Sequence, residues 1–224
     1  MIGDAQTTKK LAKANFEAWA GTYDHSLMNH FLFLPSCYTF LEELAGWQAD
    51  RKGSFDLLDI GCGTGTFTAM LSGSNLRTGC IVGLDYAMEM CRRAQHKTSS
   101  LPSDPRVRFL HGDSEHLPFE DCSFDVVTCA NSFHHYPQQQ SVVCEMRRVL
   151  RPGGQLMIID GFRDNVIGWV VFDVIIAIYE KSVYHAPWTV MRSYFESAGF
   201  ENITHRKFNL LFPAFVTVGE AKAG

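Results

Sequence analysis

The spacing of apolar and polar positions along the chain changes character near residue 50. Before that point, residues 4–19 and 35–47 carry apolar side chains at helical intervals, with a short apolar stretch at 31–34 between them. After it, short continuous apolar runs alternate with further helical patterns. We therefore expect an N-terminal helical segment, residues 1–50, followed by a main domain, residues 51–224.

The alternation in the main domain predicts a largely parallel sheet. Strands are expected at residues 55–60, 80–84, 107–110, 124–129 and 155–160, and helices at 66–71, 86–96 and 141–150. A helix at 187–198 and two strands at 203–208 and 210–218 follow. Strands that alternate with helices form right-handed βαβ units. The pattern predicts an α/β fold whose last two strands form an antiparallel hairpin.

Composition and charge narrow the class of protein. A chain of 224 residues, 46% hydrophobic and 20% charged, suits one sizeable globular domain. The formal net charge of −4 gives no reason to expect nucleic acid as a partner. The seven cysteines contain no CxxC pair, and we see no signal peptide, so we expect reduced thiols, no bound metal and a cytoplasmic location. The apolar run at 166–179 is too short for a transmembrane segment and contains Asp173, which favours a core or lid helix.

The most specific segment is LLDIGCGTG, residues 57–65, where a predicted strand runs into Gly61, Gly63 and Gly65. Glycines at a strand end let the backbone turn sharply, so a ligand can lie against the main chain. A phosphate-binding P-loop needs Lys and Ser or Thr after the last glycine, and a dinucleotide fingerprint spaces its glycines G-x-G-x-x-G. Neither pattern fits this loop. Asp59, just before it, suits an ammonium group better than a pyrophosphate.

Two aspartates follow the next two predicted strands. Asp85 lies 20 positions after Gly65 at a strand end, where a carboxylate can accept hydrogen bonds from two hydroxyl groups. It also precedes a helix, so an N-cap is a second interpretation, and both can hold at once. Asp113 follows the third strand, where an ordinary turn aspartate is the alternative to a binding residue. Both are candidates for ligand binding.

These segments resemble the class I S-adenosylmethionine-dependent methyltransferases, most closely the type 11, small-molecule branch that includes the ubiquinone and menaquinone C-methyltransferases. The resemblance rests on LDIGCGTG at 58–65, GLD at 83–85, GDSEHLPF at 112–119, FDVV at 124–127 with NSFHH at 131–135, and RVLRPGG at 148–154. These segments cover roughly residues 55–160 in the family's order and spacing. The resemblance implies a Rossmann-like, doubly wound, mostly parallel seven-stranded sheet, S-adenosylmethionine as cofactor, and methyl transfer by in-line displacement.

The resemblance also implies which residues hold the cofactor. Asp85 would bind the ribose hydroxyls and Asp113 the adenine amino group, while Tyr23 would lie near the cofactor's carboxylate under a lid helix that contains Trp19. The expected set is Tyr23, Asp59, Gly61, Cys62, Gly63, Thr64, Gly65, Asp85, Tyr86, Met88, Asp113, Ser114 and Asn131. Cys62 would contribute mainly its backbone. Plain aromatic packing is the alternative for Trp19 and Tyr23.

Four residues are candidates for catalysis on the acceptor side. Such an enzyme must align its acceptor, exclude water and, where needed, remove a proton. His134 and His135 follow the fourth strand, and Tyr184 and His185 follow the apolar run. Ordinary loop or packing roles are the alternative for all four. We expect residues 1–50 to form a lid and residues 161–186 an acceptor-pocket insertion.

The acceptor is narrowed by comparison with other methyltransferase types. The chain has NSFHHY where base-amino methyltransferases have an NPPY-like sequence, and Asn131 where catechol-type enzymes hold magnesium with acidic residues. The apolar N-terminal helices and the apolar run at 166–179 instead suggest a small, partly apolar acceptor under a lid. An NAD(P)-dependent oxidoreductase and a non-catalytic S-adenosylmethionine-binding protein stay open as alternatives. The sequence leaves the methylated atom and the oligomeric state, a dimer included, undecided.

Overall fold

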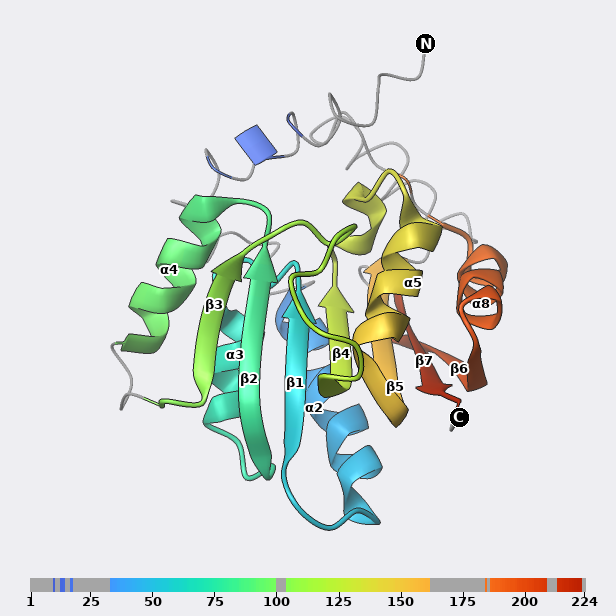
Figure 1. Ribbon diagram of the computed structural model, residues 1–224, viewed down its shortest axis with the longest axis horizontal. Helices are drawn as coiled ribbons and strands as arrows, with labels where there is room; N and C mark the ends of the chain where they lie inside the picture. The colour runs from blue at the N-terminus through green and yellow to red at the C-terminus, as the bar shows by residue number, and fades with distance from the viewer. Residues whose placement is uncertain are drawn as a thin grey trace.

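A computed structural model describes residues 10, 13–14, 17, 33–99, 104–161, 184, 186–208 and 213–222 of the chain. Seven strands form one sheet between two layers of helices (Figure 1). The strands are β1 (Phe55–Ile60), β2 (Thr78–Asp85), β3 (Val107–His111), β4 (Phe124–Ala130), β5 (Leu150–Gly161), β6 (Phe200–Phe208) and β7 (Ala214–Ala221). Their order is β3-β2-β1-β4-β5-β7-β6, with β1 to β5 parallel and β7 antiparallel to both its neighbours. The predicted α/β fold with an antiparallel C-terminal pair is confirmed.

The strand bounds differ from the predicted ones mainly where turns interrupt the apolar pattern. β5 begins at Leu150 rather than at residue 155, because Leu150 pairs with Phe124 ahead of the Pro-Gly-Gly turn and the ladder resumes at Gln155 after a register shift. Gly153 in this turn has φ +74°, which glycine adopts without strain. β6 starts at residue 200 and β7 at residue 214, so the C-terminal hairpin lies a few residues from its predicted bounds.

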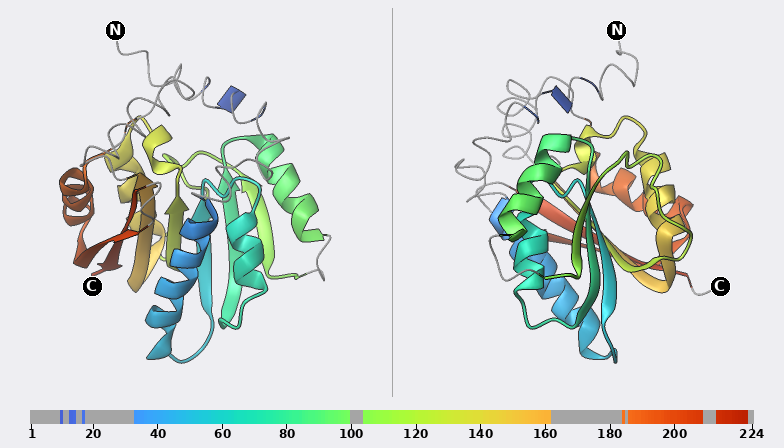
Figure 2. Two further views of the ribbon diagram at one scale, coloured as in Figure 1. Left: turned by 180° about the vertical axis from the view of Figure 1, so that it is seen from behind. Right: turned by 60° about the vertical axis from the view of Figure 1, so that its left-hand side comes forward.

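Alternate side chains of β1 divide the core into two halves. Leu57 packs with α2 (Leu34–Ala49) and α3 (Thr66–Ser72) on one face, whereas Leu58 packs with α5 (Gln139–Val149) and α8 (Trp188–Ser197) on the other. α4 (Met88–Ser99) lies beside α3 and packs over β2 and β3. Figure 2 shows helices on both sides of the sheet. The sheet is therefore doubly wound.

α2 belongs to this helix layer although its sequence falls in the expected N-terminal cap. Phe40 and Leu44 are fully buried in the same cluster as Leu57. The ring centroid of Phe40 lies 5.1 Å from that of Phe67 in α3. Residues 34–49 thus cover one face of the sheet. Most of the remaining cap, and most of the expected insertion at 161–186, lie outside the described residues.

The helices within the described ranges include none that is long and apolar enough to span a bilayer. The apolar run at 166–179 lies outside those ranges, so its expected helix is not tested.

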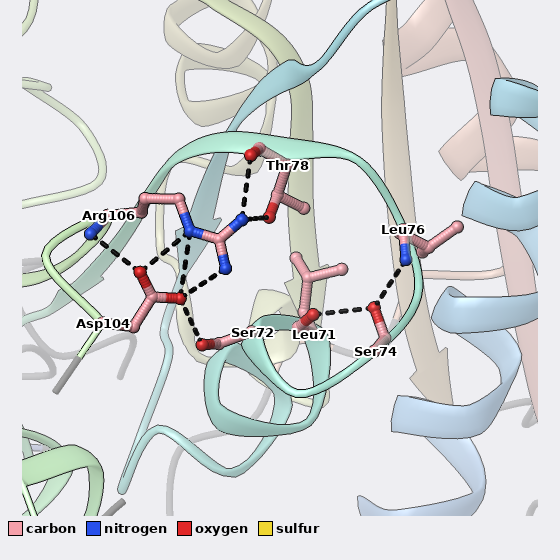
Figure 3. Close-up of polar contacts among 7 residues, drawn as sticks. All are labelled: Leu71, Ser72, Ser74, Leu76, Thr78, Asp104 and Arg106. Carbon is pink, nitrogen blue, oxygen red and sulfur yellow. Dashed lines mark hydrogen bonds and ion pairs between the residues drawn. The ribbon is translucent and has the colours of Figure 1, made fainter. Parts of the chain in front are cut away.

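A polar cluster at the start of β3 joins three segments of the chain (Figure 3). Asp104 accepts hydrogen bonds from Ser72 Oγ at 2.6 Å and from Arg106 Nη2 at 2.7 Å. The same guanidinium donates through Nη1 to Thr78 O at 3.1 Å. Arg106 holds the pKa of the Asp104 carboxyl well below its usual range. The cluster therefore ties the end of α3 and the start of β2 to the residues that lead into β3.

Asp104→Ala should lower the free energy of unfolding by about 1–2 kcal/mol, because the substitution removes the acceptor shared by Ser72 and Arg106 at a partly exposed site. Folding lowers the pKa of Asp104, so its contribution should be complete at neutral pH and decline as the pH falls below the unfolded value of 3.8. Urea unfolding of both proteins at neutral and acidic pH measures this. An equal difference between the proteins at both pH values would contradict the assignment.

Candidate functional site

A cavity lies at the carboxyl ends of β1, β2 and β4, where the strand order reverses (the upper edge of the sheet in Figure 1). Open α/β sheets bind their ligands at this switch point. The wall consists of Lys13, Ile60, Gly61, Gly63, Leu84, Asp85, Tyr86, Ala87, Met90, Gly112, Asp113, Ser114, Ala130, Asn131, Ser132, His135, Tyr136 and Pro137. Eight predicted site residues are among them: Gly61, Gly63, Asp85, Tyr86, Asp113, Ser114, Asn131 and His135.

At the glycine turn after β1, main-chain atoms without side chains line the cavity. Gly61, Gly63 and Gly65 have φ of +69°, +53° and +74°, a region that other residues adopt only with strain. The N–H groups of Gly61 and of the next residue both donate to Leu84 O, at 2.8 and 3.1 Å, and so join the end of β1 to that of β2. A Cβ added to Gly61 would lie 2.1 Å from Ser132 Oγ. Both conformation and packing therefore require glycine at position 61.

Asp85 lines the cavity at the end of β2 and also holds the turn that leads into α4. Its Oδ1 accepts the N–H of Ala87 at 2.8 Å, just before α4, and its Oδ2 accepts the N–H of Gly63 at 2.9 Å. Burial raises the pKa of the Asp85 carboxyl, and these two N–H groups act in the opposite direction. A carboxylate offers about four lone-pair positions. Two backbone hydrogen bonds therefore leave acceptor capacity for hydroxyl groups of a ligand.

Next to Asp85, the wall is formed by the turn after β2 and by the loop after β3. Asp113 Oδ1 accepts the N–H two residues later at 3.0 Å, as a turn aspartate does, and Ser114 beside it is buried. The ring of Tyr86 stacks on that of His111, with centroids 6.2 Å apart. Lys13 Nζ lies 5.5 Å from the Tyr86 ring centroid. No motif marks Lys13 in the sequence, so sequence reasoning missed this contribution from the N-terminal segment.

Two predicted residues, Asp59 and Cys62, are buried behind the wall rather than in it. Asp59 in β1 accepts a hydrogen bond from Thr128 Oγ1 at 2.9 Å. Burial raises the pKa of Asp59 to about 7, although the bond from Thr128 acts in the opposite direction. Burial also raises the pKa of the Cys62 thiol well above its usual value. A thiol so strongly held in its neutral form does not suit a nucleophile.

Three more predicted residues are absent from the cavity wall: Thr64 and Gly65 face α4, and Met88 is exposed. Thr64 Oγ1 accepts a hydrogen bond from Lys97 Nζ at 2.8 Å, and a Cβ on Gly65 would lie 2.9 Å from Ala94. Met88 is 40% exposed at the start of α4, whereas Met90 is buried and lines the cavity. Met90 and Ala94 share the apolar face of α4, and this helical spacing is the sequence signal that could have identified Met90.

The segment after β4 forms the opposite part of the wall. Asn131 has φ +51°, uncommon for a residue other than glycine, and its Nδ2 donates to Ser36 Oγ in α2 at 2.9 Å. Ser132 Oγ and the hydroxyl of Tyr136 are 2.7 Å apart. Burial raises the pKa of the Tyr136 hydroxyl well above its usual value. Neither Ser132 nor Tyr136 was predicted as a site residue, although Ser132 lies within the NSFHH segment and Tyr136 directly follows it.

His134 and His135 both lie in the 3₁₀ turn η3 (Phe133–His135), but only one of them reaches the cavity. His135 lines the cavity, whereas His134 is buried outside the wall with Nδ1 2.6 Å from Asp160 Oδ1. Tyr184 is also outside the wall, and its N–H donates to His134 O at 2.7 Å. His185, Tyr23 and Trp19 lie outside the described residues.

Comparison with known proteins shows the family. Residues 58–158 match a model of the methyltransferase domain. The demethylmenaquinone methyltransferase of Staphylococcus aureus (strain JH9) is 32% identical over 230 residues, covering 92% of each chain. A chain in the complex between the Haloferax volcanii Trm112 methyltransferase activator and a putative methyltransferase has a TM-score of 0.77 at 21% identity, covering 95% of this chain and 98% of that one. Magnesium protoporphyrin IX methyltransferase from Synechocystis PCC 6803, with bound S-adenosylhomocysteine, has a TM-score of 0.75 at 16% identity, covering 96% and 100%. These two structures therefore have the same fold as this chain.

The cavity has the chemistry that the cofactor of this family needs. Gly61 and Gly63 present main chain, and Asp85 presents a carboxylate with acceptor capacity for hydroxyl groups. The third glycine, Gly65, comes one residue earlier than in the dinucleotide fingerprint G-x-G-x-x-G, and the matching relatives are methyltransferases. The oxidoreductase alternative is therefore not favoured. The chain belongs to the class I S-adenosylmethionine-dependent methyltransferases, an enzyme family with S-adenosylmethionine as its cofactor.

Proposed function

We propose that the chain methylates a small, partly apolar acceptor of the quinol class, a hydroxylated aromatic ring with an apolar substituent. The observation that carries this proposal is the match to a demethylmenaquinone methyltransferase over 92% of both chains at 32% identity. The cavity supports it, because Ala130, Tyr136 and Pro137 give apolar surface around His135. A ring would therefore have both apolar contacts and one titratable group beside it.

We assign one part of the cavity wall to the cofactor. The main chain of Gly61 and Gly63 would lie along the cofactor, Asp85 would accept its ribose hydroxyls, and Asp113 with Ser114 would contact its adenine. Asp59, held just behind the wall, would accept the cofactor's ammonium group through a small local adjustment.

The remaining expected site residues belong to two segments that would cover the cavity. We propose that the segment before α2, with Trp19 and Tyr23, forms a lid, and that residues 161–186 form the acceptor side. Lys13 in the cavity wall supports the first assignment. The hydrogen bond from the Tyr184 N–H to His134 O supports the second.

The reaction requires the protein mainly to position the cofactor and the acceptor and to provide one proton acceptor. When bound, S-adenosylmethionine supplies a methyl carbon activated by its sulfonium sulfur. The wall must hold the acceptor in line and exclude water, which contributes much of the rate by proximity alone. A hydroxylated ring becomes nucleophilic at carbon when its hydroxyl loses a proton. After methyl transfer the ring carbon releases its own proton and the ring oxygen regains one, so one proton leaves overall. His135, a titratable side chain in the wall at this end, is the residue we assign to proton removal.

A transfer assay with methyl-labelled S-adenosylmethionine and chemically reduced demethylmenaquinone tests the proposal. The expected result is label on a ring carbon of the quinol, strongly reduced in His135→Asn while S-adenosylhomocysteine binding persists. Transfer to a catechol or an amine but not to the quinol would contradict the acceptor class. Cofactor binding without transfer to any of these acceptors would favour a non-catalytic binding protein.

Asp85→Ala should weaken S-adenosylhomocysteine binding by roughly 1–3 kcal/mol, because the ribose hydroxyls would lose their acceptor. The same change should cost about 1 kcal/mol of folding free energy, because the N–H groups of Ala87 and Gly63 would lose their acceptor. Asp85→Asn keeps an oxygen for the N–H of Ala87, so it should retain more stability than the alanine variant while still binding weakly. Isothermal titration and urea unfolding measure the two effects separately. Unchanged affinity in Asp85→Ala would remove Asp85 from the cofactor site.

A further inference from the structure

We infer that Asp160 and His134 form a buried positioning pair that holds His135 at the acceptor end of the cavity. This inference deepens the proposed function and rests on it, because it assigns the pair to the residue that we propose removes the acceptor's proton.

Asp160 is a buried carboxylate near the carboxyl end of β5, with 3% of its surface exposed. Its Oδ1 accepts the N–H of Gly161 at 2.7 Å and lies 2.6 Å from His134 Nδ1. A carboxylate in such a place is costly unless polar partners compensate its burial. Short bonds to an ionised acceptor are among the stronger hydrogen bonds in proteins. Because an unpaired carboxylate would be costly here, the hydrogen bond between Asp160 and His134 should be kept permanently rather than broken and remade.

The contact also fixes the state of the His134 ring. Asp160 Oδ1 accepts the N–H of Gly161, and we infer that it accepts from His134 as well, with Nδ1 as the donor. The ring centroid of His134 lies 4.1 Å from that of His135, with 51° between the planes. The His134 ring is thus anchored on the Asp160 side and is in contact with the His135 ring that lines the cavity.

The short turn that carries both histidines is closed by 3₁₀ hydrogen bonds. The His135 N–H donates to Ser132 O at 3.0 Å, a 3₁₀ bond of the kind that supports only short segments. External bonds reinforce it: His134 O accepts the N–H of Tyr184 at 2.7 Å, and Gln139 Nε2 donates to Phe133 O at 3.2 Å. Asp160 is the side-chain anchor of this turn on the sheet. Loss of this anchor would let His134, and with it the His135 ring that it contacts, move relative to the cavity.

The pair acts through His135 and is a positioning pair rather than a catalytic one. Neither Asp160 nor His134 is in the cavity wall. A displacement of about 1 Å in a reacting group can reduce a rate roughly 100-fold. The expected loss therefore falls on kcat, with cofactor binding preserved.

The test measures kcat, the KM for the reduced quinol and the Kd for S-adenosylhomocysteine in Asp160→Asn. The matched control is Asp125→Asn, which removes a carboxylate near the opposite end of the neighbouring strand β4, where Asp125 pairs with Arg151. Asp160→Asn should lose kcat about 100-fold with Kd nearly unchanged, and Asp125→Asn should keep its kcat. Asp160→Asn combined with His135→Asn should be no slower than His135→Asn alone. Multiplying losses in the double variant, or equal kcat in the two aspartate variants, would overturn the inference.

Two further readouts keep the inference testable if Asp160→Asn folds poorly or if the quinol is not the acceptor. The amide nitrogen of asparagine can take the place of Nδ1, so His134→Asn should lose far less kcat than His134→Leu; equal losses would overturn the positioning role. Nitrogen NMR of the ligand-free protein should show His134 protonated at Nδ1, and the His135 ring signals should move in Asp160→Asn but not in Asp125→Asn. Unmoved His135 signals would overturn the inference even without turnover, whereas moved signals with no methyl transfer would locate the failure in the proposed acceptor.

Discussion

Gly61→Ala should weaken S-adenosylhomocysteine binding and destabilise the fold. The left-handed φ of +69° costs an alanine roughly 1–2 kcal/mol. The added Cβ would also lie 2.1 Å from Ser132 Oγ and 2.6 Å from Ser132 Cβ, and such overpacking costs about 1–3 kcal/mol more. Since Gly61 and Ser132 both line the cavity, relief of the clash must distort its wall. Isothermal titration should show a loss of affinity of about tenfold or more, and urea unfolding a loss of stability near the sum of the two costs.

Gly199→Ala is the matched control for this prediction. Gly199 has φ +85°, but a Cβ there would meet nothing within 4 Å, so this variant carries the backbone strain without the clash. It should lose about 1–2 kcal/mol of stability and bind S-adenosylhomocysteine normally. Ser132→Gly in the Gly61→Ala background removes the closest clashing atoms and should recover part of the lost affinity. Equal behaviour of the two single variants would show that the contact with Ser132 does not shape the site.

Asp59→Asn should change how the stability of the ligand-free protein depends on pH. The pKa of Asp59 rises from 3.8 to about 7 on folding, chiefly because the side chain is buried in β1. Between these values the folded protein keeps a proton that the unfolded chain has released, so the contribution of Asp59 to stability falls as the pH rises. A shift of about three pKa units corresponds to at most about 4 kcal/mol. Asparagine retains an oxygen that can accept the hydrogen bond from Thr128 but does not titrate.

The measurement is the difference in unfolding free energy between the wild-type protein and Asp59→Asn across this pH range. The wild-type protein should lose stability relative to the variant as the pH rises from about 4 to about 8, with most of the loss complete near pH 7. The difference isolates Asp59 from other groups that titrate in the same range. A constant difference, or one of the opposite sign, would show that Asp59 is ionised in the folded protein throughout.

The sheet could be predicted from the sequence because its central strands are short apolar runs that end at glycines and aspartates. Leu57 and Leu58 point to opposite helix layers, and a run that is apolar at both positions is typical of a strand covered on both faces. The role of α2 could not be predicted in the same way. Its helical spacing shows that Phe40 and Leu44 are buried, but not whether a sheet or a lid buries them.

The cavity wall could be predicted where a residue follows a strand directly. Asp85, Asp113 and His135 were found because parallel strands end at one edge of the sheet. Met90 was missed in favour of Met88, because the choice depends on the rotation of α4 about its axis. The Asp160–His134 pair spans 26 positions of sequence and exists only because β4 and β5 are neighbours. No local pattern could have revealed it.

The most direct test of the account is a crystal structure of the chain with S-adenosylhomocysteine. We expect the ligand in the cavity between the glycine turn and η3, with its ribose hydroxyls on the Asp85 carboxylate, its adenine toward Asp113 and Ser114, and its sulfur toward His135. A ligand bound elsewhere, or one whose ribose does not contact Asp85, would contradict it.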